Sequence, residues 1–128
     1  MQRDRIIQHI QETYSVEAEY LWADLPDCAV FRHPGSKKWF GIIMNVQSGK
    51  LGLDGNEPVD ILNVKCGPIL VGSLLTEHGF LPSYHMNKTN WITILLNDTV
   101  PDEQIIPLLE LSYDNVAPKR KSRKQPQK

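Results

Sequence analysis

The residues best suited to contact another molecule are concentrated at positions 83–91, SYHMNKTNW. His85, Asn87 and Lys88 could donate hydrogen bonds to phosphates or base edges, and Trp91 could stack on a base. The same stretch could instead be a turn between two strands, because asparagine accepts left-handed backbone geometry and hydrogen-bonds to its own turn. The two interpretations are compatible, since a rigid turn can present Lys88 to a ligand.

A second basic stretch, RHPGSKKWF, lies at residues 32–40. Its Pro-Gly-Ser segment is typical of a turn, so the two lysines that follow would form a cationic hairpin tip beside a tryptophan. The alternative is a solvated tip with the tryptophan packed on the sheet. With Lys65 from a predicted strand, the two stretches supply the candidate nucleic-acid contacts: Arg32, His33, Lys37, Lys38, Trp39, Lys65, His85, Asn87, Lys88 and Trp91.

Charge is divided unevenly along the chain. The last ten residues, KRKSRKQPQK, hold six cations and no anion, whereas residues 1–118 hold eight cations and fifteen anions, a balance of −7. The low apolar content predicts that residues 118–128 form a disordered tail. That tail could neutralise phosphates, or it could serve only solubility. If all six cations engaged duplex DNA, log K would fall against log salt concentration with a slope of about −5. Its candidate contacts are Lys119, Arg120, Lys121, Arg123 and Lys124.

Sequence signatures of catalysis and of metal binding are missing. No two of the residues His33, His78, His85, Cys28 and Cys66 show the C-x-x-C or H-x-x-x-H spacing of metal ligands. The chain also lacks a G-x-S-x-G nucleophile elbow, a phosphate-binding loop and a dinucleotide-binding glycine motif. We therefore expect a binding protein rather than an enzyme, with no metal and no cofactor.

Hydrophobic periodicity and turn residues divide the chain into eight elements. Proline in the first turn and glycine at the end delimit the second helix, and proline followed by two acids opens the third. In the second helix, Ile69, Leu70, Leu74 and Leu75 are expected to form the apolar stripe. The predicted elements are a helix over 3–14, strands over 28–33, 38–47 and 59–66, a helix from 68 to 79, strands over 81–85 and 91–97, and a helix opening at 100–103.

The order α-β(3)-α-β(2)-α favours an α+β fold, because the strands cluster rather than alternate with helices. We expect a two-layer sandwich with an antiparallel sheet. One sheet face should meet the helices, and the other should be open to water or to a partner. Strand alternation assigns to the open face Trp39, Ile43, Asn63, Lys65 and either Trp91 or Thr93.

The totals are those of an ordinary globular protein. The chain has 128 residues, of which 41% are hydrophobic and 23% charged. We expect a single domain over residues 1–117, and two buried free thiols in a reducing cytoplasm. No stretch resembles a signal peptide or a membrane span, so we expect no membrane partner. A monomer or a weak dimer is expected.

Four segments of the chain resemble the MmcQ/YjbR family: AVFRHPGSKKWFGIIMNV, DILNVKC, PSYHMNKTNWITILL and VPDEQIIPLLELSYDNV. The resemblance runs from about residue 5 to 116, and the order FRHP, KWF, LNVKC and YHMNK-x-x-W is specific. It implies the α-β(3)-α-β(2)-α arrangement, which is similar to the CyaY-like and secretion-chaperone-like folds. It also implies DNA binding through a double wing of sheet and hairpins, and it brings no catalytic residues.

Two hypotheses of function follow from the sequence. The first is weak, salt-dependent DNA binding through the hairpin wings, the open sheet face and the tail. The second is a protein-interaction or chaperone-like module, in which Trp39, Ile43 and Ile61 form an apolar patch on the open face. The acidic body suits a protein partner at least as well as DNA.

Overall fold

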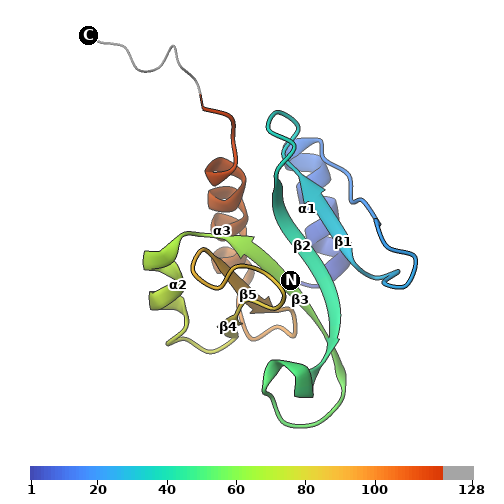
Figure 1. Cartoon of the computed structure of the whole chain (residues 1–128), viewed down its shortest axis with the longest axis vertical. Helices are drawn as coiled ribbons and strands as arrows, with labels where there is room; N and C mark the ends of the chain where they lie inside the picture. Colours follow the sequence, from blue (N-terminus) through green and yellow to red (C-terminus); the bar gives the residue numbers. More distant parts are fainter. Residues whose placement is uncertain (120–128) are drawn as a thin grey trace.

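The computed structural model describes residues 1–119 and confirms the α+β fold (Figure 1). Five strands form one antiparallel sheet in the order β1-β2-β3-β5-β4. None of the described helices is long and apolar enough to cross a bilayer. The elements are α1 Arg3–Tyr14, β1 Ala29–Arg32, β2 Trp39–Gln47, the 3-10 turn η1 Ser48–Leu51, β3 Pro58–Lys65, α2 Pro68–Leu74, β4 Phe80–Pro82, β5 Trp91–Leu95 and α3 Asp102–Asn115.

Two elements end three or more residues before their predicted ends. The strand expected over 81–85 is only Phe80–Pro82, because Pro82 cannot donate a ladder hydrogen bond and the chain then turns away. The second helix ends at Leu74 rather than near Gly79. Its predicted apolar stripe is correct for the buried Leu74 and the partly buried Leu70. It is wrong for Ile69 and Leu75, which are 86% and 41% exposed, and it omitted the buried Val71.

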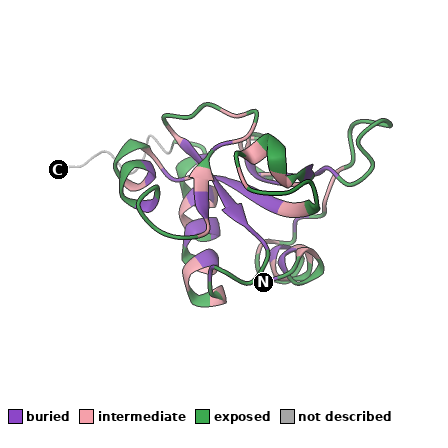
Figure 2. Cartoon of the chain, turned by 90° about the horizontal axis from the view of Figure 1, so that it is seen from below, coloured by how far each residue is buried: buried purple, intermediate pink, exposed green. Residues whose placement is uncertain are grey.

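Helices α1 and α3 lie behind the sheet in the view of Figure 1 and cover one of its faces. The strand side chains beneath them form the main core, and Figure 2 shows these strands as buried. At one end of this layer, Tyr14 of α1 stacks on Tyr113 of α3 with ring centroids 4.1 Å apart. The buried strand residues of this face include Phe31, Phe40, Ile43, Leu62, Val64, Ile92 and Ile94.

A β-bulge reverses the predicted assignment of faces in β2. Phe31 pairs with Gly41 but Arg32 pairs with Trp39, so Phe40 is an extra residue in the ladder. Strict alternation therefore fails here, and Phe40 and Ile43 both lie in the helix-side core. The prediction that Ile43 belongs to the open face is wrong. Ile42, Met44 and Val46 occupy the other face instead.

The face expected to be open is covered by two connecting segments, residues 15–28 and 83–90. Trp22 of the first packs edge-to-face on Trp39 at 6.0 Å. Met86 of the second packs against the cluster that contains Trp91. As a result Asn63 and Thr93 are fully buried and Trp91 is 7% exposed. An open sheet face is therefore absent from the part of the chain that the structure describes.

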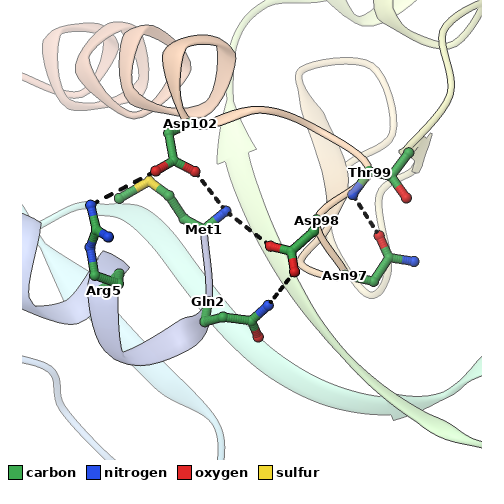
Figure 3. Close-up of polar contacts among 7 residues, drawn as sticks. All are labelled: Met1, Gln2, Arg5, Asn97, Asp98, Thr99 and Asp102. Atoms are coloured by element: carbon green, nitrogen blue, oxygen red, sulfur yellow. Dashed lines mark hydrogen bonds and ion pairs between the residues drawn. The ribbon is translucent and has the colours of Figure 1, made fainter.

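A polar cluster fastens the start of α1 to the turn before α3 (Figure 3). The Met1 amino group lies 2.9 Å from Asp102 Oδ1 and 3.9 Å from Asp98 Oδ1. Gln2 donates a hydrogen bond to Asp98 at 3.1 Å, and Arg5 lies 3.8 Å from the second Asp102 oxygen. Asp102 is also the first residue of α3, where a carboxylate is favoured by the helix dipole. The cluster therefore fixes the position of the start of α1 relative to the start of α3.

Candidate nucleic-acid interface

The 83–90 segment is a turn that satisfies its own backbone. Asn87 Oδ1 accepts hydrogen bonds from the backbone N–H groups of Thr89 and Asn90, at 2.8 and 3.1 Å. Lys88 Nζ donates to the Ser83 carbonyl at 2.9 Å, and the buried Ser83 hydroxyl donates to the Met86 carbonyl at 2.9 Å. The turn interpretation of this stretch is confirmed, and Asn87 and Lys88 have structural partners within it.

Two buried polar side chains fix this turn to the sheet. Asn63 on β3 donates to the Tyr84 carbonyl at 3.0 Å, and Thr93 on β5 accepts from the Tyr84 N–H at 2.9 Å. The Thr93 hydroxyl in turn donates to Asn63 Oδ1. Strand alternation predicted Asn63, and either Trp91 or Thr93, on an open face and did not predict this role. A polar pair in the centre of two apolar strands was the available signal, since buried polar groups need partners.

The hairpin between β1 and β2 is stabilised by two of the predicted contacts. His33 is only 8% exposed, its Nδ1 accepts a hydrogen bond from the Gly35 N–H at 2.9 Å, and its ring lies 4.3 Å from that of Tyr113. Arg32 binds Glu19 Oε1 at 3.1 Å. His33 and Arg32 therefore support the hairpin from within.

The lysines that follow in the same turn lie on its surface. Lys37 and Lys38 are both exposed, and Lys37 has a left-handed backbone with φ of 66°. Its N–H donates to the His33 carbonyl at 2.8 Å, which closes the turn. The backbone is fixed while both ammonium groups remain free to reach outward.

Three segments distant in sequence meet at one end of the sheet. Gly41 near the start of β2 pairs with Val64 near the end of β3. Asn115, the last residue of α3, donates to the Lys65 carbonyl at 2.8 Å. Pro118 lies so close to the hairpin that a Cβ added to Gly35 would be 2.9 Å from its Cγ. The hairpin tip and the described end of the chain lie together at the top of Figure 1.

We call this region the basic end and define it by Lys37, Lys38, Lys65 and Lys119. Within residues 1–119, the ion pairs involve arginines and the Met1 amino group, and none involves a lysine. Two acids on α3, Glu110 and Asp114, lie close enough to Tyr14 for their charges to act on its hydroxyl. Burial, followed by these two carboxylates, raises the pKa of Tyr14 to about 12.

The structure thus separates the ten predicted contacts into groups. Lys37 and Lys38 lie on the hairpin turn, and Lys65 ends β3 at the same end of the sheet. Trp39 is half-buried, Trp91 is buried and His85 is exposed at the 83–90 turn with φ of 63°. Lys119 is exposed beside the hairpin. The predicted tail contacts Arg120, Lys121, Arg123 and Lys124 lie outside the described residues.

The histidine, cysteine and acidic side chains of the described residues were the other candidates for a site, as metal ligands or nucleophiles. Among residues 1–119, no three histidine, cysteine or acidic side chains are grouped closely enough to hold a metal ion. Cys28 and Cys66 are buried free thiols, and burial raises the pKa of each. Both are therefore protonated, weakly nucleophilic groups at neutral pH.

Solved structures share this architecture. A crystal structure of a Pseudomonas syringae protein superposes with a TM-score of 0.88 at 39% identity, covering 91% of this chain and 99% of that one. A solution structure from the same organism superposes with a TM-score of 0.82 at 39% identity, covering 91% of this chain and 93% of that one. Deinococcus radiodurans protein DR2400 shares the fold, with a TM-score of 0.69 at 24% identity over 90% of this chain and 78% of that one.

Sequence relatives identify the family. The uncharacterised protein YyaQ of Bacillus subtilis is 44% identical over 111 residues, which are 87% of this chain and 94% of YyaQ. The uncharacterised protein YjbR of Escherichia coli K12 is 36% identical over 64 residues, which are 47% of this chain and 54% of YjbR. The YjbR family model matches residues 11–115. The chain therefore belongs to the YjbR family, as its sequence motifs predicted.

Proposed function

We propose that this protein binds DNA through the basic end, and that the cationic residues after Pro118 add phosphate contacts. The observation that supports this best is the position of Pro118 against Gly35 of the hairpin. The run that begins at Lys119 therefore starts beside Lys37 and Lys38. The family resemblance implies the same function.

The kind of contact follows from the side chains that remain free. Lysines without acidic partners are suited to phosphates, and phosphate contacts supply most of the affinity of non-specific binding. Among the groups predicted to contact bases, Trp91 is buried and the side chains of Asn87 and His33 are engaged in turns, whereas His85 is exposed. We therefore propose weak binding to the DNA backbone, with little sequence preference and no catalytic step.

The acidic body is compatible with this proposal because several of its carboxylates are engaged elsewhere. Asp60 pairs with Arg3 near the opposite end of β2, and Asp102 pairs with Arg5. The nine residues of β2 separate Lys38 from the far end of the strand by roughly 30 Å. That separation is nearly four Debye lengths at physiological ionic strength.

The test is fluorescence anisotropy of labelled duplex DNA across a salt series, with Lys38→Glu and Lys50→Glu as a matched pair. Both lysines are exposed and undergo the same change of charge, but Lys50 lies in η1 at the other end of β2. Losing one phosphate contact should make the slope of log K against log salt concentration less negative by about 0.9. It should also lower the affinity roughly tenfold at 50 mM salt. We expect this for Lys38→Glu and wild-type behaviour for Lys50→Glu.

Truncation after residue 118 separates the body from the tail. We expect weaker but measurable binding, still sensitive to Lys38→Glu. Equal losses in the two lysine variants, or a truncated chain with no affinity at all, would contradict a role for the hairpin and leave only a charged tail.

A further inference from the structure

Exposed apolar side chains are concentrated in one short segment above the loop-covered sheet face. Six large hydrophobic residues of the described chain are exposed, and four of them fall between positions 20 and 25. They are Tyr20, Leu21, Trp22 and Leu25, with exposures of 55%, 42%, 39% and 46%. An apolar surface of this kind commonly marks a binding site rather than a chance exposure.

Beneath this segment lies an apolar cavity of about 250 Å³. Its walls come from three parts of the chain: the 15–28 segment, strand β2 and the 83–90 turn. Trp22 and Trp39 meet edge-to-face at 6.0 Å on one side of it. The other wall residues include Leu25, Ile42, Met44 and Met86. The volume suits a single ring system rather than a drug-sized molecule, whose pockets begin near 300 Å³.

A second, polar cavity of about 160 Å³ adjoins the first. The two share Leu25, Cys28 and Met44 as walls, and the polar one adds Asp24, Asp27 and Asn45. The aspartates are exposed and make no ion pair within residues 1–119.

The neighbouring cation does not neutralise these aspartates. Arg3 Nη1 donates to the Asp27 carbonyl at 2.6 Å, but its guanidinium also binds both carboxylate oxygens of Asp60, at 3.1 and 3.2 Å. The charge of Arg3 is therefore balanced by Asp60. The two remaining carboxylates make the polar cavity favourable for a cation.

We propose that the paired cavities form a binding site for a small aromatic amine, with its ring in the apolar cavity and its ammonium group beside Asp24 and Asp27. Edge contacts with Trp22 and Trp39 favour an aromatic ring over an aliphatic chain. The site lies on the loop-covered face of the sheet, with Arg3 at the start of α1 beside its polar half. It uses none of the four lysines that define the basic end.

The test uses a pair of probes that share one ring and differ in charge. Tryptamine carries an indole and an ammonium group, and indole-3-propionate carries the same ring and a carboxylate. Binding of each to the full chain is followed by 15N-1H correlation spectra. We expect tryptamine to bind roughly tenfold more tightly, because opposite and like charges near two carboxylates differ in energy by a few RT. Shifts should centre on residues 22–28, 39–44 and 84–86.

Substitutions test the polar cavity and the apolar cavity separately. Asp24→Asn with Asp27→Asn should remove the preference for tryptamine, whereas Asp54→Asn, an exposed aspartate lining neither cavity, should leave it unchanged. Trp22→Ala should weaken both probes several-fold. Because these positions lie on the surface segment, folding can be checked by unchanged spectra elsewhere.

Cys28 gives a second readout, because its thiol borders both cavities while that of Cys66 borders neither. Saturating tryptamine should slow alkylation of Cys28 by N-ethylmaleimide at least threefold and leave Cys66 unaffected. Three results would overturn the proposal: no shifts with millimolar tryptamine, equal affinity for the two probes, or shifts confined to another surface.

Discussion

The two faces of the sheet are buried in different ways. The face beneath α1 and α3 is closed mainly by apolar side chains. The buried Ser112 hydroxyl on this side serves backbone groups at 2.6 and 2.8 Å. The other face is closed by two irregular segments and contains the Asn63–Thr93 pair. Loops leave backbone groups unpaired, so a loop-covered face needs internal polar partners. We expect this face to pack less completely, since both cavities of the proposed amine site lie on that side.

Adjacent isoleucines of β2 give the most sensitive test of this difference. Ile43 points to the helices and is fully buried, whereas Ile42 borders the apolar cavity and is 3% exposed. Ile43→Ala should destabilise the protein by about 4 kcal/mol, near the upper end for such truncations, and Ile42→Ala by about 2 kcal/mol. Urea unfolding monitored by circular dichroism measures both. Equal costs would show that the two faces are packed equally well.

Removal of the Thr93 hydroxyl tests the polar attachment of the 83–90 turn. Thr93→Val keeps the shape but leaves the Tyr84 N–H without its acceptor and Asn63 without its donor. We expect a loss of about 2 kcal/mol in the free energy of unfolding. Hydrogen exchange should accelerate in residues 84–90 more than in α3. Ile92→Val, a conservative change on the helix face, serves as the control, with a cost of about 1 kcal/mol.

Asp60 connects α1 to the sheet and gives a smaller, pH-dependent effect. Burial alone would raise the pKa of its carboxyl, but hydrogen bonds from Arg3 and Asn45 and the charge of Arg3 lower it overall. A lowered pKa in the folded state means that this stabilisation is present at neutral pH and is lost as the pH falls below about 4. Asp60→Asn should therefore cost about 1–2 kcal/mol at pH 7.

The pH dependence of the free energy of unfolding distinguishes the loss of an ionised carboxylate from a simple packing defect. Asp60→Asn should lose less stability than the wild type between pH 5 and pH 2, because the titrating group is gone. Parallel profiles for the two proteins would contradict a stabilising role for the ionised carboxylate.

The order of the elements could be predicted from sequence because helix and strand periodicities are local. Helix 3–14 and the strand beginning at Trp91 were placed correctly, since both are bounded by clear changes in pattern. The bulge at Phe40 could not be predicted, because it depends on how β2 pairs with Arg32 of another strand. One extra residue moved Ile43 into the core.

The candidate site was predicted in part. Exposed Lys37 and Lys38 follow from turn chemistry, and Asn87 forms the turn that its residue type predicts. The covering of the second face could not be foreseen, because it depends on where the irregular segments 15–28 and 83–90 pack. The approach of Pro118 to Gly35 is a contact between distant parts of the chain and left no local signal.

DNA contact with the basic end can be tested by titrating the full chain with a short duplex at low salt. The measured quantity is the change in chemical shift of each backbone amide. We predict the largest shifts in residues 33–38, at Lys65 and at Lys119, with little change around Lys50 and the Asp60 end of β3. Shifts spread evenly over the surface, or centred on Trp22 and Trp39, would contradict the claim.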